Sequence, residues 1–266
     1  MIDSKISNNI KIHDNIYKKY ASKHLEIYNS IEQKRLSNAI NNASSFIDNS
    51  LNDTLALDVG CGSGNLTKHM LSSGMSVTAA DVSKKFLSMI EREFSGESVS
   101  TALLNGSNLD NLPTETYNFV ATYSVLHHIP DYLHTVKEMA RVCSIGGIVF
   151  IDHECTDEYW SGESAYQAFL KKAQRLDWRK YLVLSHYISK VRRLFDEKFS
   201  SEGDIHVWPD DHIEWSKIDS VLFDSGMKRI QNDDYLLFRV NYKKDVYFEY
   251  INKCTDMRCR IYKKIR

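Results

Sequence analysis

Proline and long apolar runs are both scarce in this chain of 266 residues. With only three prolines, the sequence contains no proline-rich linker, and we find no internal repeat or low-complexity segment. No stretch approaches the roughly 18 apolar residues that a membrane span requires. The first nine residues also lack the apolar centre of a signal peptide. We therefore expect a cytoplasmic protein with no membrane span.

Cysteine pairs and a surplus of positive charge are also missing. The five cysteines form no Cys-x-x-Cys pair, so they indicate reduced thiols rather than a disulfide framework. The formal net charge is −1, whereas nucleic-acid-binding domains usually carry a basic excess. A fourth strand, expected over residues 117–124, ends in Ser124-Val-Leu-His, with no Asn-Pro-Pro-Tyr-like motif of nucleic-acid methylation. We expect no nucleic-acid partner.

What is present is an ordinary globular composition with one unusual loop. Apolar residues make up 42% and charged residues 26% of a chain long enough for one large domain, or a domain with an insertion. An apolar run over residues 55–59 predicts a buried strand, and a helical pattern starts at Asn65. Between them stand three alternate glycines, which let the backbone turn sharply and approach a ligand: Gly60, Gly62 and Gly64. A dinucleotide loop of the G-x-G-x-x-G type would need glycine at Asn65.

The segment Leu57-Asp-Val-Gly-Cys-Gly-Ser-Gly64 resembles the first motif of the class I S-adenosylmethionine-dependent methyltransferases, of the type 11/12-like kind. Their second motif, an acid at the end of the next strand, fits Asp81, which follows Asp58 by 23 residues. The resemblance covers about residues 50–154 well and residues 212–240 more loosely. It implies S-adenosylmethionine as the cofactor and says little about the substrate.

The resemblance also implies which residues contact the cofactor: Asp58, Gly60, Cys61, Gly62, Asp81, Val82, Asn108, Leu109 and Ser124. Asn108 departs from the acid that the family commonly uses for the adenine amino group, although an asparagine oxygen can still accept from it. In the family an N-terminal helix often folds over the cofactor, so Tyr17 and Tyr20 are candidate lid residues. Packing of these tyrosines against the core is the alternative.

Strands and helices alternate through the first half of the chain, which predicts an α/β fold with a doubly wound, Rossmann-like sheet of seven strands, the last antiparallel. We expect that last part as a helix over residues 213–225 and a hairpin of 227–231 with 235–240. The expected regions are a helical lid (1–50), the cofactor-binding core (51–154), a helical substrate-cap insertion (155–211), the end of the core sheet (212–240) and a basic tail (241–266). The tail carries eight Lys and Arg against three acids, a local net charge of +5. An anionic lipid surface would attract it weakly, and a solvated end helix is the default.

Histidines at the expected carboxyl edge of the sheet are candidates for a general base, which an alcohol oxygen needs when it accepts a methyl group. His153 is the first choice, because the charges of its neighbours Asp152 and Glu154 are expected to raise its basicity and orient the ring. His127 and His128 follow the fourth strand. For each histidine a structural hydrogen-bonding role is the alternative.

The aromatic-rich insertion is expected to bind the acceptor. Lys171 and Arg175 fall on one helical face that suits an anionic, sugar-like molecule, or is simply solvated. Trp160 and His206 are further candidates for acceptor contact. The spacing of the acids and histidines matches no metal-ligand pattern, so we expect no metal.

Together these features predict O-methylation of a small-molecule or glycan acceptor. The alternatives are N- or C-methylation of another metabolite, and a non-catalytic cofactor-binding subunit of a larger complex.

Overall fold

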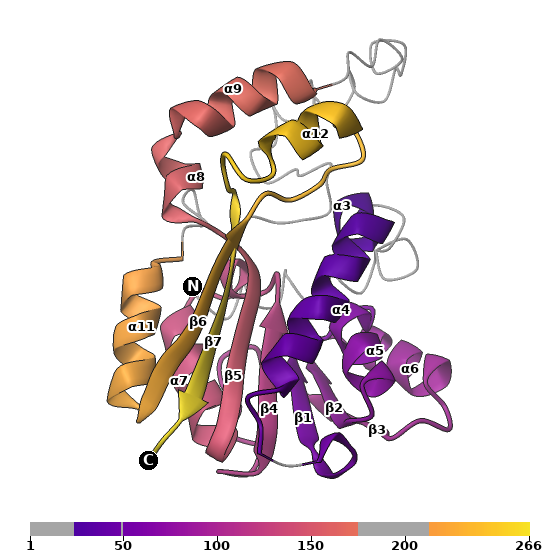
Figure 1. The fold of residues 1–266 in the computed structure, drawn as a ribbon. Helices are drawn as coiled ribbons and strands as arrows, with labels where there is room; N and C mark the ends of the chain where they lie inside the picture. Colours follow the sequence, from indigo (N-terminus) through magenta and orange to yellow (C-terminus); the bar gives the residue numbers. More distant parts are fainter. Residues whose placement is uncertain (1–23, 49, 175–212) are drawn as a thin grey trace, which may run out of the picture.

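The computed structural model describes residues 24–48, 50–174 and 213–266. Within these residues seven strands form one sheet in the order β3-β2-β1-β4-β5-β7-β6 (Figure 1). The strands are β1 (Leu55–Val59), β2 (Ser76–Asp81), β3 (Val99–Leu103), β4 (Tyr117–Tyr123), β5 (Cys143–Cys155), β6 (Met227–Tyr235) and β7 (Met257–Lys264). β1 to β5 are parallel, and β7 runs antiparallel between β5 and β6. The predicted seven-stranded α/β sheet with an antiparallel strand is confirmed.

Helices cover both faces of the sheet, because successive strand residues point to opposite sides. Ala56 of β1 packs with α4 (Ser30–Ser44) and α5 (Asn65–Ser72), while Leu57 packs with α7 (Tyr132–Val142) and α11 (Trp215–Asp224). On the first face α6 (Lys84–Glu93) packs against β2 and β3. The strand order reverses between β1 and β4, which is the switch point where ligands bind in such sheets.

The predicted hairpin over residues 227–240 is wrong. β6 runs without a turn through Asn232 and Asp234, and its partner is β7, far along the chain. Nε of Arg258 donates to Asp234 at 2.6 Å, and Nε of Arg260 donates to Asn232 at 2.6 Å. Residues 232–234 have the composition of a turn, but arginines of the neighbouring strand pair with Asn232 and Asp234 along the exposed edge of the sheet.

The prediction of a solvated end helix for residues 241–266 is wrong for residues 257–264, which form the strand β7, whereas residues 244–250 do form a helix. Most of β7 is buried, and its basic side chains are held by the protein: Nζ of Lys264 donates to the carbonyl oxygens of Ala140 and Cys143 at 3.0 and 2.9 Å. The positive charges of β7 therefore stabilise the fold from within the sheet and are not available as a lipid-facing patch.

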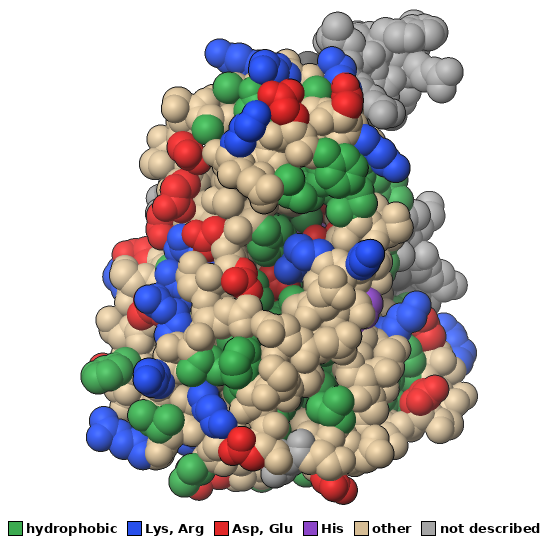
Figure 2. Space-filling view, in the orientation of Figure 1, with side chains coloured by type: hydrophobic (Ala, Val, Ile, Leu, Met, Phe, Trp, Pro, Cys, Tyr) green, Lys and Arg blue, Asp and Glu red, His purple; other side chains and the backbone are tan. Residues whose placement is uncertain are grey.

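Three helices gather at the carboxyl edge of the sheet and form what we call the cap: α8 (Asp157–Ser161), α9 (Ser164–Ala173) and α12 (Lys244–Tyr250) (Figure 1). Phe169 of α9 packs on Tyr242 and Tyr250, so the cap joins the described part of the predicted insertion to the chain end. Figure 2 shows hydrophobic side chains gathered just below the cap, with acidic and basic side chains beneath them.

Candidate functional site

The glycine loop after β1 is shaped by the neighbouring strand ends. The amides of Gly60 and Cys61 both donate to the carbonyl oxygen of Ala80, at 2.8 and 3.0 Å, which ties the loop to the end of β2. Gly60 has a φ of 74°, and a Cβ there would lie 2.6 Å from a methyl group of Val125. Gly62 has a φ of 48°, but its Cβ would meet no atom within 4 Å. The loop therefore leaves open space at Gly62.

Asp81 holds the other side of this loop. One carboxylate oxygen accepts the amide hydrogen of Gly62 at 2.9 Å, and the other accepts that of Ser83 at 2.8 Å. The residue is 7% exposed and lines the open space. Each carboxylate oxygen has two lone pairs, so further acceptor capacity remains for hydroxyl groups of a ligand.

Asp58 lies deeper, at the end of β1, and is almost fully buried. Its carboxylate accepts the hydroxyl hydrogen of Thr67 at 2.6 Å, in the first turn of α5. Burial raises the pKa of Asp58 to about 7 against the opposing effect of the hydrogen bonds from Thr67, and the charge of Asp81 adds to the rise. A positively charged ligand beside Asp58 would therefore favour its ionised form.

These residues surround a pocket of about 1220 Å³, counted to its open mouth. This figure includes the solvent-open part, and the walls come from the glycine loop and from the ends of neighbouring strands. All nine residues of the core that the sequence predicted to contact the cofactor line this pocket: Asp58, Gly60, Cys61, Gly62, Asp81, Val82, Asn108, Leu109 and Ser124.

The pocket has a wall that the sequence reasoning missed. The short helix α3 (Leu25–Tyr28) brings Ile27 and Tyr28 to the pocket, and the hydroxyl of Tyr28 bonds that of Ser63 in the glycine loop. Tyr20, the predicted lid residue, lies outside the described residues, as does Tyr17. The four-residue spacing of Tyr20, His24 and Tyr28 is the signal that could have extended the predicted lid to Tyr28.

His153 is placed at the carboxyl edge of the sheet, but not as we expected. Its ring is buried, and neither ring nitrogen has a hydrogen-bond partner in the described parts of the chain. Burial, together with the positive charge of Arg35, holds the pKa of His153 well below its ordinary value. The expectation that Asp152 and Glu154 raise its basicity is therefore wrong, because both carboxylates are engaged elsewhere.

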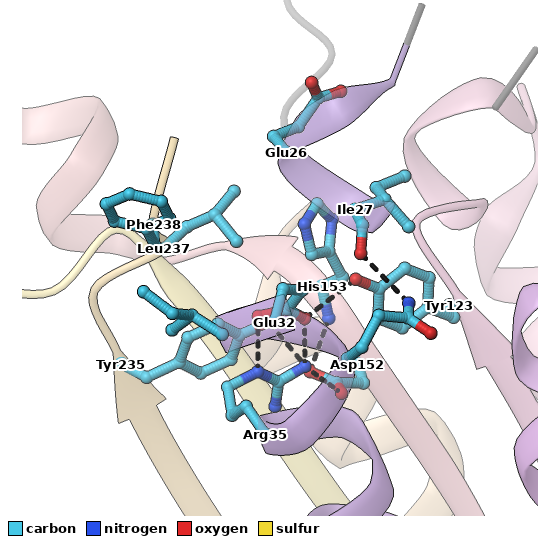
Figure 3. A network of polar contacts seen from close by, with 12 residues as sticks. Glu26, Ile27, Glu32, Arg35, Tyr123, Asp152, His153, Tyr235, Leu237 and Phe238 are labelled. Atoms are coloured by element: carbon cyan, nitrogen blue, oxygen red, sulfur yellow. Dashed lines mark hydrogen bonds and ion pairs between the residues drawn. The ribbon is translucent and has the colours of Figure 1, made fainter. Parts of the chain in front are cut away.

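Asp152 belongs to a buried network shown in Figure 3. Nη2 of Arg35 donates to Asp152 at 2.7 Å and to Glu32 at 2.6 Å, and its guanidinium stacks on the ring of Tyr235 at 3.9 Å. The hydroxyl of Tyr123 donates to Glu32 at 2.8 Å. The network joins α4 to three strands beneath the cap.

Glu154 instead pairs with His127. Its Oε2 lies 2.7 Å from Nδ1 of His127, in the 3₁₀ turn η3 (Leu126–His128), and its Oε1 accepts the amide hydrogens of Val125 and Leu126. The rings of His127 and His128 are 4.0 Å apart, and His128 lines the pocket. A histidine fixed by a buried carboxylate thus stands next to the pocket wall.

The predicted acceptor contacts are dispersed. Trp160 is 41% exposed in α8, and Lys171 is exposed on α9. Arg175 and His206 lie outside the described residues. Across the described ranges no group of histidines, cysteines and acids is arranged to hold a metal, and none of the helices there is long and apolar enough to cross a membrane.

Comparison with known proteins bears on this pocket. A family described as "Methyltransferase domain" matches residues 57–151, which run from β1 to β5 and include the glycine loop and Asp81. Residues 57–151 form a class I S-adenosylmethionine-dependent methyltransferase domain.

The ubiquinone biosynthesis O-methyltransferase of Nitrosomonas europaea is 32% identical over 102 residues, 38% of this chain and 43% of that enzyme. The demethylmenaquinone methyltransferase of Bacillus licheniformis is 35% identical over 98 residues, 35% of this chain and 42% of that enzyme. The methyltransferase domain thus matches less than half the length of either relative.

Solved structures extend the likeness of fold beyond the methyltransferase domain. The magnesium protoporphyrin IX methyltransferase of Synechocystis, solved with bound S-adenosylmethionine, superimposes with a TM-score of 0.55 at 13% identity, covering 96% of this chain and 97% of that one. A putative methyltransferase from Haloferax volcanii, solved in complex with a methyltransferase activator, gives a TM-score of 0.60 at 11% identity and covers 97% of both chains.

The pocket of the methyltransferase domain fits S-adenosylmethionine, its cofactor. Asp81 offers carboxylate oxygens for ribose hydroxyls, and Asp58 suits the positive charges of the methionine part. The open space at Gly62 is a cradle that a side chain would fill. The free backbone N–H groups at the N-terminal end of α5 also face the glycine loop, where they would favour a carboxylate group of the ligand.

Proposed function

We propose that this chain transfers a methyl group from S-adenosylmethionine to a hydroxyl oxygen of a small aromatic acceptor, with His127 as the general base. The observation that carries the proposal is the pairing of His127 with the buried carboxylate of Glu154, in contact with His128, which lines the cofactor pocket. His127 replaces His153 as the first choice. A base must accept a proton, and the surroundings of His153 oppose a positive charge on its ring.

The residues of this chain would divide the work as follows. When bound, the cofactor supplies a methyl group on a positively charged sulfur, which leaves as a neutral thioether. The pocket walls align the acceptor oxygen with that methyl group, and alignment accounts for much of the acceleration in such a displacement. With Nδ1 of His127 donating to Glu154, Nε2 is the basic nitrogen and takes the hydroxyl proton. Glu154 then stabilises the resulting imidazolium.

Two observations support a small aromatic acceptor over a glycan. One relative is named for ubiquinone biosynthesis and the other for demethylmenaquinone, and both names denote small molecules with a quinone ring. In addition, Lys171, on which the anionic sugar-like acceptor depended, is exposed on the cap instead of facing the pocket. N- or C-methylation remains the alternative, since the cofactor pocket is indifferent to the acceptor atom.

A methyl-transfer assay with mass-spectrometric detection tests the proposal. The protein is incubated with S-adenosylmethionine and a panel of phenols, sugars and amines, and both S-adenosylhomocysteine and the methylated product are measured. We expect transfer to phenols, and a kcat about 10²–10⁴-fold lower in His127→Ala with unchanged affinity for S-adenosylhomocysteine. Methylation of amines or carbon alone, or a His127→Ala variant with wild-type kcat, would overturn the proposal.

A further inference from the structure

Three features of His153 are energetically unfavourable for the folded protein. The proposed proton transfer to His127 involves none of them. The backbone of His153 has a φ of 63°, a left-handed conformation that non-glycine residues rarely adopt. The residue is 6% exposed. Both ring nitrogens are buried without a hydrogen-bond partner in the described parts of the chain. Buried polar groups are nearly always paired, and strained residues cluster where ligands bind, so this imidazole points to a missing partner.

The conformation of His153 is imposed by its surroundings. The register of β5 against β7 shifts between Ile151 and Glu154, which inserts an extra residue into β5 at this point. The amide of His153 donates to the side chain of Asp152 at 2.7 Å, and the same oxygen accepts the hydroxyl hydrogen of Tyr235 at 3.0 Å. Asp152 is held in turn by Arg35. A bulge and a buried ion pair therefore fix the direction of the ring.

The walls around the ring are apolar and aromatic. The ring of Tyr123 lies 4.7 Å from that of His153, centre to centre. In Figure 3 the imidazole stands between Ile27 and Tyr123 on one side and the segment of Leu237 and Phe238 on the other. Ile27 and Tyr123 also line the cofactor pocket, so these two side chains separate the imidazole from it.

The charged groups nearby already have partners. Arg35 pairs with Glu32 and Asp152, and Arg239 lies 3.5 Å from the carboxylate of Asp256. The imidazole therefore presents a neutral donor and a neutral acceptor among apolar walls. An anionic ligand group would find no unpaired cation among these residues, whereas a neutral oxygen would satisfy the ring.

We propose that the imidazole of His153 is the recognition site for the acceptor and binds a neutral hydroxyl or carbonyl oxygen carried on an aromatic ring. The proposed site depends on the proposed function in one respect: the ligand bound at His153 is taken to be the molecule that is methylated. Entry requires displacement of Ile27, which belongs to the four-residue helix α3. His153 is thus a specificity-determining residue, while His127 carries the proton.

Phenol and benzene are the probes that test this site, because they differ only in the hydroxyl. The protein is labelled with ¹⁵N-histidine and saturated with S-adenosylhomocysteine, and each probe is titrated by NMR. We expect phenol to shift the ring nitrogen signals of His153 and to bind about 10-fold more tightly than benzene, as a hydrogen bond to an otherwise unpaired buried group implies. His153→Phe should bind both probes equally, with unchanged affinity for S-adenosylhomocysteine.

Further variants keep the test decisive. If His153→Phe fails to fold, His153→Gly removes the ring and relieves the left-handed backbone, and it should also lose the preference for phenol. His127→Ala should retain that preference. Phenol that shifts His153 in a protein that methylates no acceptor would leave the site standing and remove the proposed function. Phenol that leaves the His153 signals unchanged, or a His153→Phe variant that still prefers phenol, would overturn the site.

Discussion

Oε2 of Glu154 lies 2.7 Å from Nδ1 of His127, although the two residues belong to different elements, β5 and η3. The parallel pairing of β4 with β5 brings their carboxyl ends together and so creates this contact. The other oxygen of Glu154 accepts two amide hydrogens of the chain that leads into η3. The carboxylate therefore fixes both the turn and the histidine ring.

Replacement of Glu154 by glutamine should lower kcat for methyl transfer, by up to the 10²–10⁴-fold that a general base contributes. The amide keeps the shape of the side chain but no longer stabilises a charged imidazole at His127. His134→Ala, at an exposed site of α7, is the matched control and should keep wild-type kcat. Steady-state kinetics for both variants check this, and a Glu154→Gln variant as fast as His134→Ala would exclude the pair from catalysis.

Asp58 should make stability depend on pH. Its pKa is raised from 3.8 to about 7 by burial, so the folded protein holds this proton more tightly than the unfolded chain. The favourable contribution is complete below about pH 4 and is lost as the pH rises to about 7. Asp58→Asn removes the charge and can still accept from Thr67. Urea denaturation should therefore show a larger stability gain of Asp58→Asn over wild type at pH 8 than at pH 5, and an equal gain at both pH values would contradict the raised pKa of Asp58.

Gly60 and Gly62 should respond differently to alanine. A methyl group at Gly60 would strike Val125, and the left-handed backbone adds roughly 1–2 kcal/mol of strain, so Gly60→Ala should lower the free energy of unfolding. Gly62→Ala shares the strain, but its methyl group enters open space in the pocket. Thermal unfolding and calorimetry should show the larger stability loss in Gly60→Ala, and a loss of cofactor affinity in Gly62→Ala. Unimpaired binding in Gly62→Ala would place the cofactor elsewhere.

Breaking the ion pairs of Arg35 should lower the free energy of unfolding more than breaking an exposed ion pair. Asp152 is fully buried and Glu32 nearly so, and Arg35→Met would leave both carboxylates without their cation. Removal of one partner from a buried pair costs about 3–5 kcal/mol of stability. Lys253→Met breaks an exposed pair with Glu249 and should cost less than about 1 kcal/mol. Equal losses in chemical denaturation would mean that the network at Arg35 does not stabilise the fold.

The cofactor-binding residues could be predicted from the sequence, because each of them belongs to a recognisable local sequence pattern. The parallel pairing of β1 and β2 brings together the acid near the end of each strand and the alternate glycines that follow β1, and Asp58, Gly62 and Asp81 line one pocket. Asn108 and Ser124 reach the same pocket for the same reason, as they follow β3 and β4.

The other half depends on contacts between distant segments. Arg35 of α4 binds Asp152, whose carboxylate in turn accepts the amide hydrogen of His153 and so fixes the direction of its ring. No sequence pattern near Arg35 or Asp152 predicts that these two residues pair. Likewise, Asp234 resembles a turn residue until Arg258 is placed opposite it on β7. The partners of buried charges could not be assigned without the fold.

Titration calorimetry with S-adenosylhomocysteine measures whether the pocket at Asp81 binds the cofactor. Wild type and the exposed-site variant Asp53→Asn should bind with equal affinity. Asp81→Ala should lose about 1–3 kcal/mol of binding free energy, the cost of hydrogen bonds to a charged group. An Asp81→Ala variant that binds as tightly as wild type, or a wild-type protein that does not bind at all, would contradict the account.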